Sequence, residues 1–165
     1  MVIGISTSGA AAYVQRAIAY GRELGCGTCY IMCTPKPFYE ADADVVIRVE
    51  TGPEVITGST RMKAGTATKL VLNMISTATM IQLGKVYGNL MVDLMAVNEK
   101  LVDRGTRIIS QLTGLDNDES QKALFAADKS VKKAVIMVKK ECSLEEAGEL
   151  LANEKGLLRN IIGPK

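Results

Sequence analysis

The sequence contains no histidine and no tryptophan, and few other aromatic residues among its 165 positions. Without histidine, proton transfer near pH 7 must fall to carboxylates, lysine or tyrosine with shifted pKa values. An aromatic content of 4% leaves little on which nucleic-acid bases could stack, and a net charge of +2 is too small to indicate a polyanionic partner. We therefore expect no nucleic-acid partner.

Long apolar runs are also lacking. The richest run, residues 70–83, is shorter than the ~18 residues of a membrane span, and it contains polar residues such as Asn73 and Gln82. No basic, apolar leader is visible, since Met1 is followed directly by Val-Ile-Gly-Ile. These features predict a cytoplasmic protein with no membrane partner.

The four cysteines do not form a recognisable metal-binding pattern. Cys26, Cys29 and Cys33 are close in sequence, but a zinc site needs about four ligands, and the fourth cysteine is the distant Cys142. Cys29 and Cys33 fall in a segment typical of a buried strand, where free cysteine acts as a small apolar residue. A structural role is favoured over a metal or redox role, and we expect no metal and no cofactor.

Short apolar segments predict an α/β fold for the first part of the chain. The runs 2–5, 28–33 and 45–49 are typical of buried strands, and a helical pattern that ends at Gly25 separates the first two. This order indicates a three-stranded parallel sheet flanked by helices, with the strands ordered as in the chain. A largely apolar helical stretch at 59–83 must be buried in a core or against a partner.

The rest of the chain is predicted to be helical. We expect a long helix from Asn89 to about Leu112, with an inner stripe of apolar residues: Leu90, Leu94, Val97, Leu101 and Ile108. We assign residues 1–113 to the α/β domain and residues 114–165 to a small helical domain.

Within that helical domain, capping residues mark where the short helices begin. Asp116 or Asn117 caps the first, Ser130 the second, and Ser143 with Glu146 forms a capping box for the third. A last helix is expected at 157–162. The lysines there are expected to form a solvated face rather than a polyanion site: Lys129, Lys132, Lys133, Lys139 and Lys140.

Residues 52–69 are the most informative segment. They place one carboxylate just before the apolar helix, together with hydroxyls and cations: Glu54, Ser59, Thr60, Arg61 and Lys63. Unpaired amides at a helix start favour an anion such as phosphate, whereas a carboxylate suits a sugar hydroxyl or a proton transfer. The segment predicts a sugar phosphate as ligand; the alternative is an ordinary polar helix cap.

A second candidate loop is Ser6, Thr7, Ser8 and Gly9. It follows a strand and opens a helix, an arrangement in which a loop can hold a phosphate. The alternative is again a plain helix cap.

Four segments carry a resemblance to a known family. Residues 52–69, 69–74 (Lys-Leu-Val-Leu-Asn-Met), 84–93 (Gly-Lys-Val-Tyr-Gly-Asn-Leu-Met-Val-Asp) and 98–101 (Asn-Glu-Lys-Leu) resemble the N-acetylmuramic acid 6-phosphate etherases and their relative, the glucokinase regulatory protein. The resemblance runs from Val2 onward. It implies the C-terminal portion of a sugar isomerase domain, and a homodimer.

For activity, the resemblance implies a lyase of peptidoglycan recycling. Such a lyase cleaves the lactyl ether of its amino-sugar phosphate substrate and yields N-acetylglucosamine 6-phosphate and lactate. Its two catalytic glutamates belong to the first half of the family domain, which these residues do not include. We therefore expect a truncated form with little activity. Because the two catalytic glutamates are missing, no catalytic residue is assigned.

The resemblance also bears on the two candidate loops. Ser6–Gly9 correspond to a Ser-x-Ser-Gly-x-Thr phosphate loop, in which Ala11 here replaces the threonine. Losing that hydroxyl is expected to weaken phosphate binding by roughly 1–2 kcal/mol. Glu54 corresponds to a proton-transfer glutamate of related phosphosugar isomerases, which makes it a possible acid/base group.

Three functions remain open from the sequence. The first is an etherase-type lyase, the second a non-catalytic sugar-phosphate sensor or interaction module, and the third an aldose–ketose isomerase that uses Glu54. The apolar strand at 2–5 and the apolar helix at 70–83 also need neighbours, so self-association as a dimer is expected.

Overall fold

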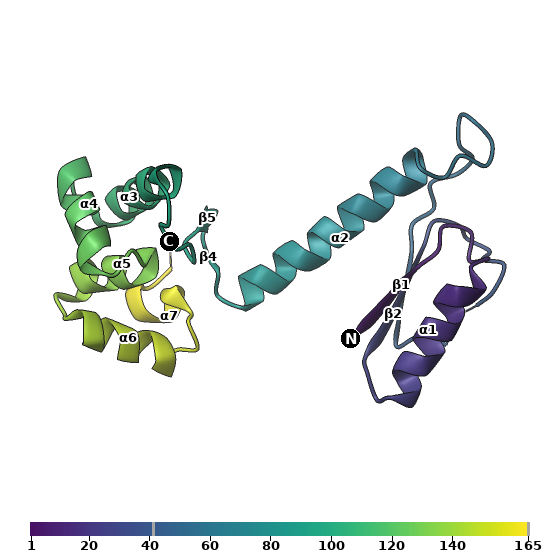
Figure 1. Ribbon diagram of the computed structural model, residues 1–165, viewed down its shortest axis with the longest axis horizontal. Helices are drawn as coiled ribbons and strands as arrows, with labels where there is room; N and C mark the ends of the chain where they lie inside the picture. The colour runs from purple at the N-terminus through teal and green to yellow at the C-terminus, as the bar shows by residue number, and fades with distance from the viewer. Residues whose placement is uncertain (41, 165) are drawn as a thin grey trace. The chain divides into compact units, whose positions relative to one another are not determined.

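The computed structural model describes residues 1–40 and 42–164. Two compact units divide the chain, Met1–Ile75 and Ser76–Lys165, and the boundary falls within one helix. Figure 1 labels the elements of both units. In the described residues, no helix combines the length and apolar character that crossing a bilayer requires.

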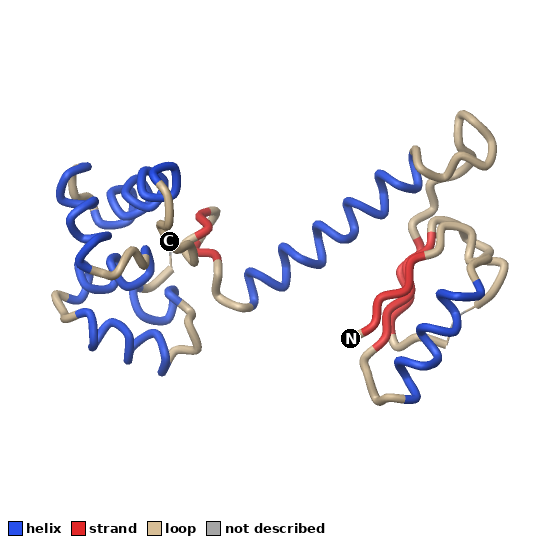
Figure 2. The backbone as a smooth tube through the Cα atoms, in the orientation of Figure 1, coloured by secondary structure: helices blue, strands red, loops and turns tan. Residues whose placement is uncertain are grey.

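The first unit is built on a parallel sheet. Its strands are β1 (Val2–Ile5), β2 (Thr28–Met32) and β3 (Val45–Arg48), in that order (Figure 2). In the parallel register, Val2 pairs with Thr28 and Cys29 with Val45. The predicted α/β fold, with three parallel strands ordered as in the chain, is confirmed.

Helices cover both faces of this sheet. Along β2, Tyr30 and Met32 pack against Ile18 of α1 (Ala12–Glu23). The alternate residues Cys29 and Ile31 pack against Val71 of α2 (Lys63–Gln82). Every residue of β2 is buried, as expected for the central strand of a parallel sheet, whose two faces are both covered.

The second unit begins with a short hairpin and continues as helices. The hairpin pairs β4 (Val86–Tyr87) with β5 (Leu90–Met91). The helices are α3 (Glu99–Thr113), α4 (Asn117–Ala126), α5 (Val131–Lys140), α6 (Leu144–Asn153) and α7 (Leu158–Ile162). Their buried residues form one core, which includes Ile109, Leu124 and Val135.

The predicted caps of the short helices are confirmed. The Asp116 side chain accepts a hydrogen bond from the Glu119 amide in a capping box, and the Ser130 side chain accepts one from the Lys133 amide. Ser143 and Glu146 form the expected capping box. These caps depend on residues only three apart, which is why the sequence alone revealed them.

The predicted helix from Asn89 to Leu112 is wrong over its first ten positions. A two-residue Gly-Asn turn joins β4 to β5, and α3 begins only at Glu99, where the Asn98 side chain accepts from the Leu101 amide. Between them, Val92, Leu94 and Ala96 are buried, whereas Val97 is 74% exposed. The burial alternates with a period of two, so the segment is extended.

The predicted boundary between residues 113 and 114 concerns the domains of the family, and it stays a prediction. In the structure, α3 packs on α4 and α5, so it belongs to the same compact unit as they do. Gly105 lies at this contact, where a Cβ would come 3.1 Å from a Val131 methyl group and 3.2 Å from a Leu124 methyl group.

The lysine-rich face is not wholly solvated, and the prediction is wrong for Lys132. Lys132 is only 7% exposed, because its ammonium group donates to the Gly156 carbonyl at 3.0 Å and lies 3.3 Å from Asp93. Asp93 also pairs with Lys85 at 2.6 Å. These contacts tie α5 to the hairpin segment and to the turn before α7.

We expect Lys132→Met to lower the free energy of unfolding by about 2 kcal/mol, because it leaves the Gly156 carbonyl and part of the Asp93 charge without a partner. Chemical denaturation of the 165-residue chain measures this loss. Lys133→Met is the matched control, since the neighbouring lysine has no ion pair within the described residues. Equal stability of the two variants would contradict the assignment.

Candidate functional site

The loop Ser6–Gly9 leaves the sheet at the carboxyl end of β1. The Ser6 amide continues the strand pairing by donating to the Ile31 carbonyl at 3.0 Å, and the Gly9 amide closes a turn on the Ser6 carbonyl at 3.1 Å. Gly9 has a φ of 73°, a backbone conformation that glycine adopts readily and other residues rarely do. Helix α1 begins directly afterwards.

A second loop, residues 33–39, holds the first one in place. The amides of Cys33, Phe38 and Tyr39 donate to the carbonyls of Thr7, Ser8 and Gly9 at 2.9, 2.9 and 3.2 Å. The approach is close, because a Cβ on Gly9 would lie 2.4 Å from the Pro37 Cβ. The carbonyls of the loop are therefore turned towards residues 33–39.

From Ser6 to the first residue of α1, four backbone amides have no acceptor within the described part of the chain: those of Thr7, Ser8, Ala10 and Ala12. The Ser6 hydroxyl accepts from the Ala11 amide at 3.4 Å. Vacant amides at the start of a helix form a favourable environment for an anion.

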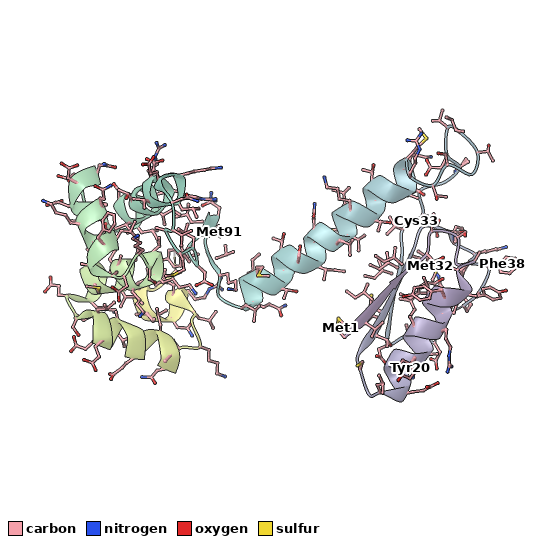
Figure 3. All side chains as sticks on the ribbon, in the orientation of Figure 1. Met1, Tyr20, Met32, Cys33, Phe38 and Met91 are labelled. Carbon is pink, nitrogen blue, oxygen red and sulfur yellow. The ribbon has the colours of Figure 1, made fainter. Side chains whose placement is uncertain are left out.

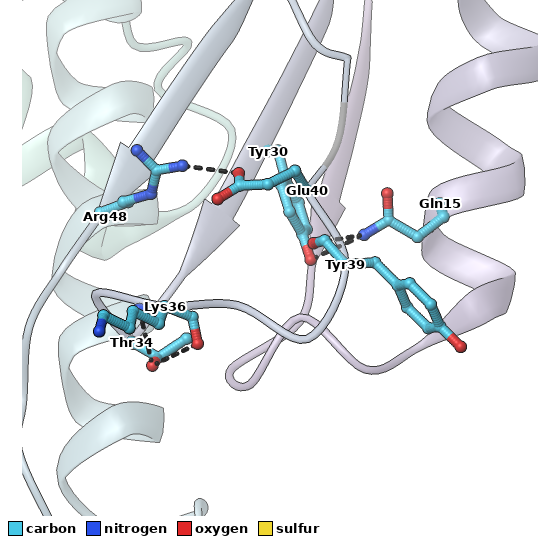
Figure 4. A network of polar contacts seen from close by, with 7 residues as sticks. All are labelled: Gln15, Tyr30, Thr34, Lys36, Tyr39, Glu40 and Arg48. Atoms are coloured by element: carbon cyan, nitrogen blue, oxygen red, sulfur yellow. Dashed lines mark hydrogen bonds and ion pairs between the residues drawn. The ribbon is translucent and has the colours of Figure 1, made fainter.

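Polar contacts fasten residues 34–40 to the sheet and to α1 (Figure 4). The Gln15 side chain donates to the Tyr30 hydroxyl at 2.9 Å and to the Tyr39 carbonyl at 3.5 Å. Arg48 pairs with Glu40 at 2.7 Å. These contacts hold the loop that positions Ser6–Gly9.

At the start of α2, the amides are already occupied. The two oxygens of the Glu54 carboxylate accept from the Lys63 and Ala64 amides, each at 2.9 Å. The amides of Ser59 and Thr60 are used within the preceding turns, on the carbonyls of Ile56 and Gly58. Glu54 thus caps α2 from a position nine residues before the helix begins.

These contacts set the ionisation of Glu54. Hydrogen bonds from the Ala64 and Lys63 amides lower the pKa of the Glu54 carboxyl below its usual value, and the Lys63 charge adds to the effect. Glu54 is therefore ionised at neutral pH, which favours a capping role. Its acid/base role stays a prediction.

Cys33 contacts both the Ser6–Gly9 loop and the start of α2 at one edge of the sheet. The amide of Cys33, which is labelled in Figure 3, donates to the Thr7 carbonyl. The Cys33 thiol lies 3.6 Å from both the Ala64 carbonyl and the Thr68 hydroxyl. The Ser6–Gly9 loop and the first turn of α2 are thus both in contact with a single residue. This agrees with the rule that loops at the carboxyl ends of parallel strands meet.

The predicted cations lie on the surface beside these loops. Arg61 and Lys63 are exposed, and with Thr66 they line a shallow depression along the first turns of α2. Neither forms an ion pair within the described residues. Their charges are available to an anionic ligand.

The cysteines of this unit have structural positions. Cys29 is buried in β2, and burial raises the pKa of its thiol. Among the described residues, no group of three or more histidine, cysteine, aspartate or glutamate side chains could hold a metal ion.

Sequence reasoning missed the supporting loop, residues 33–39. It predicted a strand at 28–33 and assigned no role to the residues after it. The loop could have been found from its position, because it follows β2 and must reach the same edge of the parallel sheet as Ser6–Gly9.

The fold and the position of these loops define the class of the molecule. A parallel sheet covered by helices on both faces, with polar loops at the carboxyl ends of its strands, is consistent with the partial sugar isomerase fold that the resemblance implies.

Comparison with known proteins points to one family within this class. The chain is 50% identical over 159 residues to proteins named N-acetylmuramic acid 6-phosphate etherase in Yersinia pestis (strain Pestoides F) and Yersinia pseudotuberculosis serotype O:1b (strain IP 31758). Each match covers 96% of this chain and 54% of the relative. The chain is thus a relative of these etherases, which confirms the resemblance, and it spans about half their length. No protein-family model matches it.

We expect Glu54→Gln to lower the melting temperature at pH 7, because glutamine offers only one acceptor oxygen to two amides. The pKa of Glu54 is lowered by folding, so its stabilising effect is present above the usual carboxyl pKa and is lost as the pH falls through the folded value. The difference between variant and parent should therefore shrink in acid.

Thermal unfolding measured from pH 7 down to pH 3 checks this expectation. Glu50→Gln is the control, since it removes the same charge from a side chain that makes no hydrogen bond within the described residues. A loss of stability that is equal for both variants, or independent of pH, would show that Glu54 does not cap α2.

Proposed function

We propose that this chain supplies a sugar-phosphate-binding part of an etherase-type lyase. The substrate would be N-acetylmuramic acid 6-phosphate, and the products N-acetylglucosamine 6-phosphate and lactate. The names of its relatives support this reaction. Because the chain spans 54% of their length, the reaction is proposed for the larger protein.

One observation carries the proposal: the vacant amides of the loop after β1. Thr7, Ser8, Ala10 and Ala12 present N–H groups that have no acceptor among residues 1–40 and 42–164, next to the Ser6 and Ser8 hydroxyls. A phosphate placed there would receive several hydrogen bonds at a helix start. The first turn of α2, by contrast, already holds the Glu54 carboxylate.

A non-catalytic sensor is the second candidate, favoured by the state of Glu54. Its carboxylate is engaged by two amides and its pKa is lowered, so it is poorly suited to take up a proton near pH 7. The same contacts weigh against an isomerase that uses Glu54 as its base. A chain that binds sugar phosphate without turning it over would fit this candidate.

For the phosphate site, we expect N-acetylglucosamine 6-phosphate to bind and N-acetylglucosamine to bind at least tenfold more weakly at that loop. Ser8→Ala should weaken binding of the phosphate about tenfold, the scale of one hydrogen bond to a charged group. NMR titrations that follow the backbone amides of residues 6–12 measure both effects at that loop. Equal affinity for the two sugars would remove the basis for a phosphate site.

For catalysis, we expect the isolated 165-residue chain to release no lactate from N-acetylmuramic acid 6-phosphate, because the glutamate pair implied by the resemblance is not among its residues. A coupled lactate assay measures this. Binding without lactate release is the expected outcome, and sustained turnover would contradict it.

We also propose that the chain self-associates as a dimer. Several large apolar side chains of β1 and of the middle of α2 remain exposed: Ile3, Ile5, Leu70, Leu72 and Met74. Wet apolar surface costs about 25 cal/mol per Å² relative to burial, so covering these residues against a second copy is favourable.

Light scattering at micromolar concentration tests the dimer. We expect a mass of about twice the 17.7 kDa of one chain. Leu70→Gln should shift the species towards monomer, whereas Lys139→Gln on α5 should not. A folded species that stays near 17.7 kDa at all concentrations would refute self-association.

A further inference from the structure

A hollow of the second unit lies between α3 and α4 and holds about 490 Å³, within the range of small-molecule sites. Two helical stripes line it. Glu99, Val102, Asp103 and Thr106 recur on one face of α3, and Asn117, Gln121 and Phe125 on one face of α4. Residues 96–98 and Lys129 complete the lining.

A buried hydroxyl without a partner lies in this lining. Thr106 is 2% exposed, and its hydroxyl oxygen makes no hydrogen bond within the described residues. Leaving a buried polar group unpaired costs free energy, so such groups are rare in folded proteins. Serving a bound molecule is one of the roles that explains such a group.

Other polar groups around the hollow are also free to bind. The Gln121 and Asn117 side chains make no hydrogen bond within the described part of the chain, whereas the Asn98 side-chain oxygen is used by the Leu101 amide. The Lys129 ammonium lies 5.8 Å from the centre of the Phe125 ring. Amides, carboxylates and an aromatic face thus line the hollow together, and the Thr106 hydroxyl lies buried in its wall.

The charges decide which ligand chemistry fits. Glu99 and Asp103 contribute two negative charges; Lys129 contributes one positive charge, and Arg107 pairs with Asp103 at 3.1 Å. The two signs offset each other, so a phosphate gains no net attraction and a neutral ligand fits best. Carboxylate oxygens accept hydrogen bonds from hydroxyl groups, and side-chain amides both donate and accept them. Phe125 and Val102 offer apolar contact for a ring.

We infer that the hollow between α3 and α4 is a binding site for a neutral, hydroxyl-rich molecule of monosaccharide size. The site is separate from the proposed phosphate site, because all of its residues belong to the second unit. The inference does not depend on the etherase reaction.

The experiment titrates the isotope-labelled 165-residue chain with N-acetylglucosamine and follows the backbone amides by NMR. We expect saturable shifts of amides in residues 96–106 and 117–129. N-acetylglucosamine 6-phosphate should affect these amides more weakly and act instead on the loop 6–12. Alanine, a zwitterion, should leave them unchanged.

The variant Thr106→Val distinguishes a role of the hydroxyl in ligand binding from a role in stability. Valine has the same shape without the hydroxyl, so the melting temperature should stay equal or rise, while affinity for N-acetylglucosamine at residues 96–129 falls about 2–10-fold. Thr113→Val is the matched control on the same helix: its hydroxyl donates to the Ile109 carbonyl at 2.7 Å, so the melting temperature should fall and the affinity should not change.

A second variant keeps the test independent of the core. Gln121 lies on the exposed side of the hollow, and the variant Gln121→Leu should also weaken binding of the sugar. The inference is overturned if the wild-type amides show no saturable shift, if the phosphorylated sugar binds this hollow more tightly, or if both Thr106→Val and Gln121→Leu bind as the parent does.

Discussion

The complete burial of β2 is the constraint on which the candidate site depends. A strand covered on both faces needs a partner on each edge, and β1 and β3 supply them. That pairing determines where the loops after β1 and β2 emerge. Cys33, the first residue beyond β2, can then bond Thr7 and lie against the first turn of α2.

The two helix starts at this edge differ in their electrostatics. The start of α2 carries its own anion, the Glu54 carboxylate, held by two amides. In the described part of the chain, the amides before α1 that lack an acceptor have no carboxylate bound to them. Because an anion gains most where amides are unpaired, we propose that a phosphate binds at the α1 loop, with Arg61 and Lys63 at the neighbouring surface. The amides at the start of α2 are thus bonded within the chain, whereas the amides before α1 remain available to a ligand.

Local signals in the sequence predicted much of the fold, and long-range contacts account for what they missed. Asp116, Ser130 and Ser143 act on amides three residues away, so their roles could be inferred from spacing. Glu54 reaches the amides of a helix that begins nine residues later, a contact that depends on how the intervening loop folds.

Two errors have the same origin. The stretch from Leu90 to Val97 has apolar residues that fit a helical stripe, yet the pairing of β4 with β5 makes it extended. Lys132 belongs to a row of lysines typical of a solvated face, and its burial follows from Asp93 and Gly156, which are far away in the sequence. The buried Thr106 likewise has no distinguishing mark in the sequence. Partners that lie far along the chain cannot be deduced from local periodicity.

The close approach of Gly9 to Pro37 has a consequence for sequence variation. The two positions share one small volume, since any side chain at 9 would meet the Pro37 ring. Relatives that carry a larger residue at the first position must therefore route the second loop differently, and the two changes should occur together. Loops grafted from another member of the family would have to be exchanged as a pair.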